Sequence, residues 1–229
     1  MGNFARGTQA LADVLVAPVD HREIFLAWKD IARPTQIAPP MPYWIWIIMA
    51  GRGWGKNRTG AEWVRELVFE QGVKNLALIG RTASDVRDTM LNNPGSGLLN
   101  IFPPSQQPVW EPSKRLITWP NGARAITFSA DKPDQLRGPQ FEAVWGDEVS
   151  TWRYPESLDN ALLALRLGEV PRMLLTMTPK PTRLVRELVS RDGEDLVHVT
   201  RGATIDNEAN LAPSVVRQLH ARYEGTRME

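Results

Sequence analysis

The feature that most constrains the fold is a glycine-rich turn between an apolar run and a helical pattern. The turn is Ala50-Gly51-Arg52-Gly53-Trp54-Gly55-Lys56-Asn57, and it follows the apolar residues 43–49 and precedes a helix expected over residues 58–71. A strand, a glycine-rich turn and a helix in this order let backbone amides and the helix dipole converge on phosphate groups. Lys56 would neutralise the outer phosphates. The sequence therefore predicts a nucleoside triphosphate site, with an ordinary strand-to-helix turn as the alternative.

The turn departs from the G-x-x-x-x-G-K-[ST] pattern at both ends. Ala50 occupies the first position, where its small side chain is tolerable, and Asn57 occupies the last, where a hydroxyl normally ligates Mg²⁺. An amide oxygen can reach a metal ion if its donor end points elsewhere. We therefore predict that Asn57 is a weak metal ligand.

Composition sets the class of protein but leaves its partners open. With 229 residues, 42% apolar content and nine tryptophans, the chain can bury a core as one large domain or as a domain plus an appendage. The absence of cysteine excludes disulfides and thiolate metal sites. The chain carries no export signal and no membrane-length apolar run, so we expect an intracellular protein that does not bind a membrane. The formal net charge of +1 neither supports nor excludes DNA binding.

Periodicity divides the chain into three parts. Residues 1–32 are expected to be a leader followed by a helix over 21–32 with Asp20 as its N-cap, residues 33–200 an α/β core, and residues 201–229 a C-terminal helical segment. The alternation of elements in the core predicts an α/β fold with a mostly parallel central sheet flanked by helices.

The individual elements of the core follow from apolar runs and turn residues. Asn121-Gly122 predicts a tight hairpin turn, and residues 93–112 are expected to be a long surface loop. Strands are expected over 43–49, 75–79, 115–119, 124–128, 141–145, 172–176 and 196–200, and helices over 58–71, 155–167, 182–190 and 213–223.

The apolar run 141–146 delivers Asp147 and Glu148 at its carboxyl end, where open α/β sheets bind ligands. One carboxylate can hold Mg²⁺ while its neighbour orients a water for attack on the γ-phosphate, so we assign Asp147 to the metal and Glu148 to the water. A solvated turn after a strand is the alternative. Thr176 and Thr178 end another apolar strand, where hydroxyls can sense a γ-phosphate or simply close the strand.

Together these motifs resemble the ATPase domain of the large terminase subunit of tailed double-stranded DNA bacteriophages. The resemblance spans residues 28–227. It implies a P-loop NTPase fold and an ATP-hydrolysing motor that drives double-stranded DNA into a prohead. The segments that carry it are Arg33-Pro34-Thr35-Gln36, Gly51-Arg52-Gly53-Trp54-Gly55-Lys56, Gly60-Ala61-Glu62-Trp63-Val64, Leu136-Arg137-Gly138-Pro139-Gln140-Phe141, Trp145-Gly146-Asp147-Glu148, Thr176-Met177-Thr178-Pro179 and Tyr223-Glu224-Gly225-Thr226-Arg227.

The resemblance also implies roles for single residues. Gln36 would read the adenine base, although a lone glutamine beside prolines is usually a surface residue. Arg137 would act as a finger on the γ-phosphate of a neighbouring subunit, with a solvated loop charge as the alternative. Thr176 and Thr178 match the motif that couples hydrolysis to DNA movement. The nucleotide contacts implied within and beside the turn are Arg52, Gly53, Trp54, Gly55, Lys56, Asn57 and Arg58.

The resemblance further implies partners and a location. These are the backbone of double-stranded DNA, the portal protein, the small terminase subunit and other copies of the chain in a ring on the prohead, in the host cytoplasm. Family members continue into a nuclease domain of the RNase H type, so we expect this chain to lack cutting activity. Another P-loop translocase or helicase, or a nucleotide-binding assembly module with little hydrolysis, remains an alternative function.

Overall fold

The computed structural model describes residues 28–223. The chain divides into two compact units, residues 1–32 and 33–229. In the first unit residues 28–31 are helical, while Asp20 and the rest of the helix expected over 21–32 lie outside the described residues, as do residues 1–19 and 224–229.

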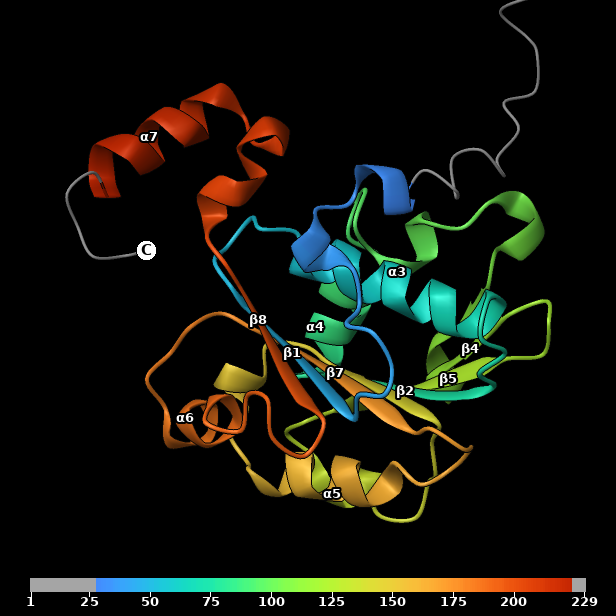
Figure 1. Cartoon of the computed structure of the whole chain (residues 1–229). Helices are drawn as coiled ribbons and strands as arrows, with labels where there is room; N and C mark the ends of the chain where they lie inside the picture. The colour runs from blue at the N-terminus through green and yellow to red at the C-terminus, as the bar shows by residue number, and fades with distance from the viewer. Residues whose placement is uncertain (1–27, 224–229) are drawn as a thin grey trace, which may run out of the picture. The chain divides into compact units, whose positions relative to one another are not determined.

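The second unit is built around an eight-stranded sheet in the order β3-β4-β5-β2-β6-β7-β1-β8 (Figure 1). From β5 to β8 every neighbouring pair is parallel, and the β3–β4 and β4–β5 pairs are antiparallel. This arrangement confirms the predicted mostly parallel sheet with an added hairpin. The strands are β1 (Ile45–Ala50), β2 (Asn75–Gly80), β3 (Val109–Glu111), β4 (Leu116–Thr118), β5 (Arg124–Ser129), β6 (Ala143–Gly146), β7 (Arg172–Met177) and β8 (Val197–Gly202).

Helices cover both faces of the sheet (Figure 1). Helix α3 (Lys56–Phe69) buries Trp63 and Leu67 in the apolar cluster on one face, and α5 (Glu156–Ala164) and α6 (Arg183–Val189) bury Leu158 and Leu188 in the cluster on the other. Strands covered on both faces must be apolar throughout, which explains the unbroken apolar run of β1. None of the helices in the described part of the chain has the length and hydrophobicity needed to cross a bilayer.

Shorter helical segments complete the unit. They are η1 (Pro34–Gln36), α4 (Ala83–Asp85), the π-helix η2 (Val86–Leu91), η3 (Leu98–Asn100), η4 (Pro104–Gln106), η5 (Pro112–Lys114), η6 (Pro133–Leu136), η7 (Val149–Thr151) and η8 (Thr204–Asn210), and the last helix is α7 (Pro213–Tyr223).

Two segments differ from the prediction. Residues 93–112 are not a surface loop, because Leu98 and Phe102 are buried in the core and β3 pairs with β4. A three-residue edge strand carries too little alternation to be recognised in a sequence. The other segment is α4 with η2, which was not predicted; Thr82 caps it by accepting a hydrogen bond from the Asp85 N–H.

At Gly60, helix α3 packs directly against the ring of Trp145, which belongs to strand β6. A Cβ atom added at Gly60 would lie 2.3 Å from two ring atoms of Trp145, whose side chain is fully buried. The glycine therefore sets the distance between the helix that follows the glycine-rich turn and the strand that carries Asp147.

We expect Gly60→Ala to destabilise the protein even though alanine is the better helix former by about 1 kcal/mol. Overpacking of a rigid core typically costs about 1–3 kcal/mol, so after the gain in helix propensity the predicted net loss in free energy of unfolding is up to about 2 kcal/mol, measured by urea denaturation. In a Trp145→Phe background the smaller ring should reduce this loss. A Gly60→Ala variant as stable as the parent would contradict the close contact.

Candidate functional site

The candidate site lies where three adjacent parallel strands end. The glycine-rich turn follows β1, Asp147 and Glu148 follow β6, and Thr176 and Thr178 lie at and just beyond the end of β7, which separates β1 from β6. Carboxyl ends of neighbouring parallel strands share one edge of a sheet, which is where such sheets bind ligands. The fold thus brings together residues that are more than a hundred positions apart.

Lys56 contacts both halves of this edge. Its Nζ donates hydrogen bonds to Ala50 O at 2.9 Å, to Gly51 O at 3.2 Å and to Thr178 Oγ1 at 3.2 Å. The same Nζ lies 3.5 Å from Glu148 Oε1. The ammonium group is therefore held at the turn and partly neutralised by a carboxylate.

Asp147 is a buried carboxylate. Its side chain accepts a hydrogen bond from Thr176 Oγ1, and the residue is only 6% exposed. Burial raises the pKa of Asp147 to about 6, and the charge of Glu148 adds to the rise, while the Thr176 hydrogen bond and Lys56 oppose it. A cation bound here would remove the cost of burying this charge.

Glu148 adopts a left-handed backbone conformation, with φ 50° and ψ 44°. Its Oε1 accepts a hydrogen bond from Thr178 Oγ1 at 2.8 Å and its Oε2 accepts one from Thr178 N at 3.2 Å. Left-handed backbone in a residue other than glycine costs free energy and is frequent at functional sites. Here it accompanies a side chain that is bound to the end of β7.

Asn57 is anchored by its donor end. Its Nδ2 donates to Thr89 O at 2.6 Å and to Ser96 O at 3.1 Å, whereas its Oδ1 is buried without a hydrogen-bond partner in the described part of the chain. The amide oxygen is thus left as an acceptor, which is the orientation that metal ligation requires.

The donor set fits Mg²⁺. The described residues contain no group of three or more His, Cys, Asp or Glu side chains that could hold a metal. Mg²⁺ needs no such group, because it is usually bound through one or two carboxylates together with phosphate oxygens and water. Asp147 is a carboxylate that could bind the ion, and the Asn57 amide oxygen, in the first turn of α3, is an acceptor without a partner in the described residues.

Gln36 is not the surface residue that its sequence context allows. It is 7% exposed, its Nε2 donates to Thr59 Oγ1 at 3.0 Å, and its Oε1 accepts from Arg33 N at 3.3 Å. Its Nε2 also lies 3.0 Å from the position of a Cβ on Gly55. The side chain therefore lies against the turn, with its amide bonded within the chain.

The remaining predicted residues have varied surroundings. Trp54 is fully buried, and Arg52 is exposed in the turn. Arg58 donates to Gly95 O at 3.1 Å and forms an ion pair of 2.7 Å with Glu62.

Arg137 lies on the surface, directly after η6. Its side chain is 68% exposed, and the ion pair described for it joins it to Asp134 at 3.3 Å. None of the contacts described for Arg137 joins it to the glycine-rich turn.

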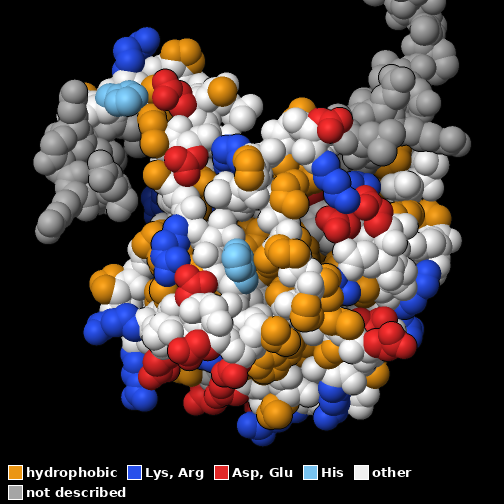
Figure 2. All heavy atoms as spheres, in the orientation of Figure 1, with side chains coloured by type: hydrophobic (Ala, Val, Ile, Leu, Met, Phe, Trp, Pro, Cys, Tyr) orange, Lys and Arg blue, Asp and Glu red, His pale blue; other side chains and the backbone are white. Residues whose placement is uncertain are grey.

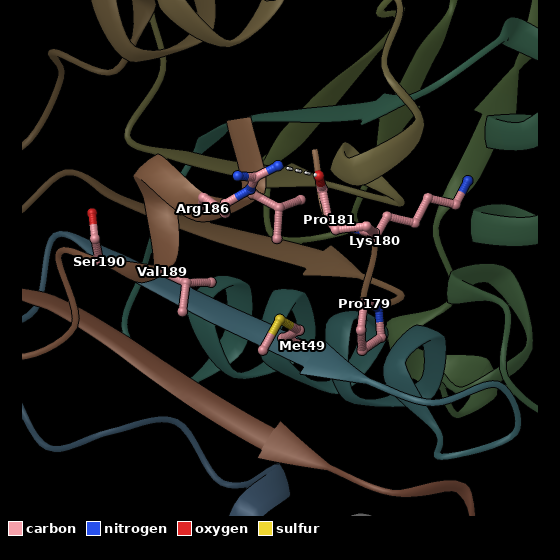
Figure 3. Close-up of a pocket in the computed structure, with 8 residues that line it drawn as sticks. Met49, Pro179, Lys180, Pro181, Arg186, Val189 and Ser190 are labelled. Carbon is pink, nitrogen blue, oxygen red and sulfur yellow. Dashed lines mark hydrogen bonds between the residues drawn. The ribbon is translucent and has the colours of Figure 1, made fainter. Parts of the chain in front are cut away.

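A cavity of about 560 Å³ lies beside this site, on the side of the sheet covered by α6 (Figure 3). It is lined by Met49 of β1, by residues 179–181 after Thr178, and by Val185, Arg186, Val189 and Ser190. In Figure 3 the Lys180 side chain points away from Met49, and Arg186 donates to Pro181 O at 2.9 Å. The cavity contains none of the predicted nucleotide contacts, so it borders the segment after β7 and not the turn itself.

Sequence reasoning missed the residues that hold the site from outside. Thr89 and Ser96 anchor Asn57 through their backbone carbonyl oxygens and the Ser96 hydroxyl. Every residue type has a backbone carbonyl, and serine is common, so neither residue stands out in the sequence. Arg33 belongs to the motif Arg33-Pro34-Thr35-Gln36, for which the resemblance implies a role only at Gln36, and Asn207 lies in no motif. Both side chains nevertheless bind the glycine-rich turn. Side chains that contact backbone carbonyls far along the chain leave no pattern in a single sequence.

Comparisons with known proteins agree with this architecture. Residues 47–229 match the family described as "Terminase large subunit, T4likevirus-type, N-terminal". No curated protein matches the chain. The large terminase ATPase domain of Thermus phage P74-26 is similar in fold, with 14% identity and a TM-score of 0.64 over 90% of this chain and 93% of that one.

The large terminase of a thermophilic bacteriophage, solved with ADP, is also similar, with 14% identity and a TM-score of 0.63 over 88% of this chain. The alignment covers 49% of that terminase, so the present chain spans about half the length of that protein. At this identity the likeness establishes the fold. The family match covers most of the chain, and the chain therefore belongs to the large terminase family of DNA-packaging proteins, within the region that corresponds to their N-terminal domain.

Proposed function

We propose that this chain is the ATP-hydrolysing motor domain of a viral DNA-packaging large terminase. The observation that carries the proposal is the meeting of Lys56, Asp147 and Glu148 at the ends of β1 and β6, on either side of β7. The large terminase of the thermophilic bacteriophage was solved with ADP and with ATP-γ-S, which supports a nucleotide site in this fold.

In the proposed mechanism the polyphosphate lies over the glycine-rich turn. Phosphate oxygens replace the carbonyl oxygens of Ala50 and Gly51 as partners of the Lys56 ammonium. Asp147 and the Asn57 amide oxygen would hold Mg²⁺, an ion that would supply charge neutralisation at the phosphates. Arg52 is free to reach the phosphates from its exposed position in the turn.

Glu148 orients the attacking water. Its carboxylate already accepts two hydrogen bonds from Thr178, which fix its direction. Thr178 thereby connects the group that handles the water to the end of β7, and this supports the coupling role that we propose for Thr176 and Thr178.

Arg137 acts in trans in this proposal. Its exposure makes it available to a neighbouring subunit, where its guanidinium would stabilise charge on the γ-phosphate. In the same proposal the chain forms a ring with other copies of itself and binds the portal protein and the small terminase subunit.

DNA would be held through its backbone without sequence reading, as a translocating motor requires. Figure 2 shows basic and acidic side chains interspersed over the face that it displays. This mixed pattern agrees with the net charge of +1 and does not by itself mark the DNA contact.

Glu148→Gln should abolish turnover while leaving nucleotide binding nearly unchanged. The glutamine keeps the shape and an acceptor for Thr178 but cannot take a proton, and losing general-base assistance costs about 10²–10⁴-fold in kcat. ATP hydrolysis in assembled motors and ADP affinity are the two measurements, with the exposed Glu187→Gln as control. Unchanged hydrolysis would remove Glu148 from this role.

Asp147→Asn should stabilise the metal-free protein at alkaline pH. Because the pKa of Asp147 is raised from 3.8 to about 6, the folded state binds more protons than the unfolded state within this window. The free energy of unfolding therefore falls as pH rises from 3.8 to about 6, and it stays lower above pH 6. The shift corresponds to at most about 3 kcal/mol.

The measurement is urea denaturation in EDTA at pH 8 and pH 4. Asparagine keeps an acceptor for Thr176 but carries no charge, so its advantage should be present at pH 8 and vanish at pH 4. Asp134→Asn, whose side chain is 85% exposed, is the matched control and should change stability little. An Asp147→Asn protein less stable than its parent at pH 8 would contradict the cost of the buried charge.

Mixed motors test the trans role of Arg137. Subunits with Arg137→Ala and subunits with Glu148→Gln are each expected to be inactive alone. Mixing them creates interfaces where an intact Arg137 faces an intact Glu148, so partial recovery of ATPase activity is expected. Absence of recovery at every mixing ratio would assign Arg137 a role within its own subunit or in structure.

A further inference from the structure

Two side chains from distant segments bind the glycine-rich turn from outside. Arg33, before β1, donates from Nη2 to Trp54 O, and its guanidinium carbon lies 4.8 Å from the centre of the Trp54 ring. Asn207, in η8, donates from Nδ2 to Gly53 O at 2.7 Å. Arg33 Nη1 donates to Asn207 Oδ1 at 2.8 Å, which joins the two. We call Arg33 and Asn207 the outer clasp.

The outer clasp fixes the direction of two peptide groups. A carbonyl and the N–H of the next residue point in opposite directions across a planar trans peptide. Holding Gly53 O and Trp54 O toward the clasp therefore directs the N–H groups of Trp54 and Gly55 to the opposite side. Amides turned to a common side are what a turn needs to bind an anion.

Glycines make this geometry possible. Gly53 has φ 75° and Gly55 has φ 105°, values that glycine adopts without strain. Within the described part of the chain, the Trp54 N–H otherwise makes a long 3.4 Å contact with Gly51 O, so it is available for a stronger acceptor. The clasp supplies the directional contacts that such mobile residues lack.

Stability alone explains Arg33 poorly. Its Nε is buried without a hydrogen-bond partner in the described residues, and burial lowers the pKa of its guanidinium. Leaving a buried donor unpaired is unfavourable. An apolar residue stacked on Trp54 would avoid this cost. It could not donate hydrogen bonds to Trp54 O and to Asn207 Oδ1, as Arg33 does.

We propose that Arg33 and Asn207 are positioning residues that hold the turn in its phosphate-binding shape. The inference rests on the proposed nucleotide site and adds to it the two groups that preorganise the turn. Asn207 belongs to the segment after β8 and is separated from Gly53 by 154 positions in the sequence. Under this proposal the shape of the turn therefore depends on a distant part of the chain.

The variants Asn207→Ala and Arg33→Lys test the proposal. Lysine keeps the charge but has a single ammonium, which cannot reproduce the guanidinium fork that reaches both Trp54 O and Asn207 Oδ1. Both variants should bind ADP about ten-fold more weakly than the parent and lose most of the gain in affinity from AMP to ADP. Calorimetric titration with ADP and AMP in the presence of Mg²⁺ measures this gain.

Asn160→Ala is the matched control. Asn160 is half-buried and donates from Nδ2 to Pro133 O at 3.0 Å, so it makes the same kind of contact on α5, away from the turn. Urea denaturation of all variants shows that they are folded, and Asn207→Ala serves if Arg33→Lys does not fold.

The outcomes separate the clasp from the nucleotide site. A parent protein that does not bind ADP would remove the proposed site itself. A parent that binds ADP, with clasp variants that bind it as tightly as Asn160→Ala does, would overturn the clasp. An equal loss of ADP and AMP affinity would also overturn it, because general loosening and not phosphate positioning would then be the cause.

Discussion

The parallel pairing of β6, β7 and β1 is the constraint on which the site depends. Gly146 pairs with Leu175 and Ile48 pairs with Thr176, so Asp147, one residue beyond Gly146, reaches the level of Thr176. The Asp147–Thr176 hydrogen bond follows from this register. A slip of one residue would turn every side chain to the other face, and both apolar clusters would lose their contacts. The hydrophobic cores on the two faces therefore fix the positions of the polar groups at the edge.

The site contains several features that weaken the folded state. The ionisable side chain of Asp147 is buried, and the backbone of Glu148 is left-handed. The Asn57 amide oxygen lacks a hydrogen-bond partner in the described residues. A bound cation would reduce the cost of the buried Asp147 charge. Functional sites commonly carry such unfavourable groups, and a large core is what tolerates them. Here helix α3 packs on β6 through the buried Trp145 ring, for which Gly60 leaves room.

The fold could be predicted from sequence where the signal was periodic. Strand β1 and helix α3 combine an apolar run, glycines and helical spacing, and they were found with their ends within two residues. The shared edge of Asp147 and the glycine-rich turn followed from topology, because both motifs come at the carboxyl ends of strands that were expected to be parallel. Elements that depend on tertiary contacts were missed: β3 exists because β4 pairs with it, and η2 is a π-helix stabilised by burial of Val86 and Met90.

The side-chain partners within the site could not be predicted for the same reason. That Asn57 would bind Thr89 and Ser96 depends on the path of residues 86–97, which carry no regular pattern. The burial of Gln36 depends on its contact with Thr59 on α3. Sequence patterns identify which chemical groups a site contains, and the packing of neighbouring segments decides which of their atoms remain available.

Thr178 joins the two halves of the site through a single hydroxyl. It accepts a hydrogen bond from Lys56 Nζ and donates its own proton to Glu148 Oε1, so both groups are held by one atom. In the proposed mechanism phosphate oxygens become partners of Lys56 in place of the Ala50 and Gly51 carbonyls, while the Thr178 hydroxyl connects that ammonium group to Glu148. Residues 179–181, which follow directly, line the cavity beside α6 (Figure 3). The hydroxyl of Thr178 and the residues that line this cavity therefore belong to one continuous segment, which connects the proposed coupling residues to the face covered by α6.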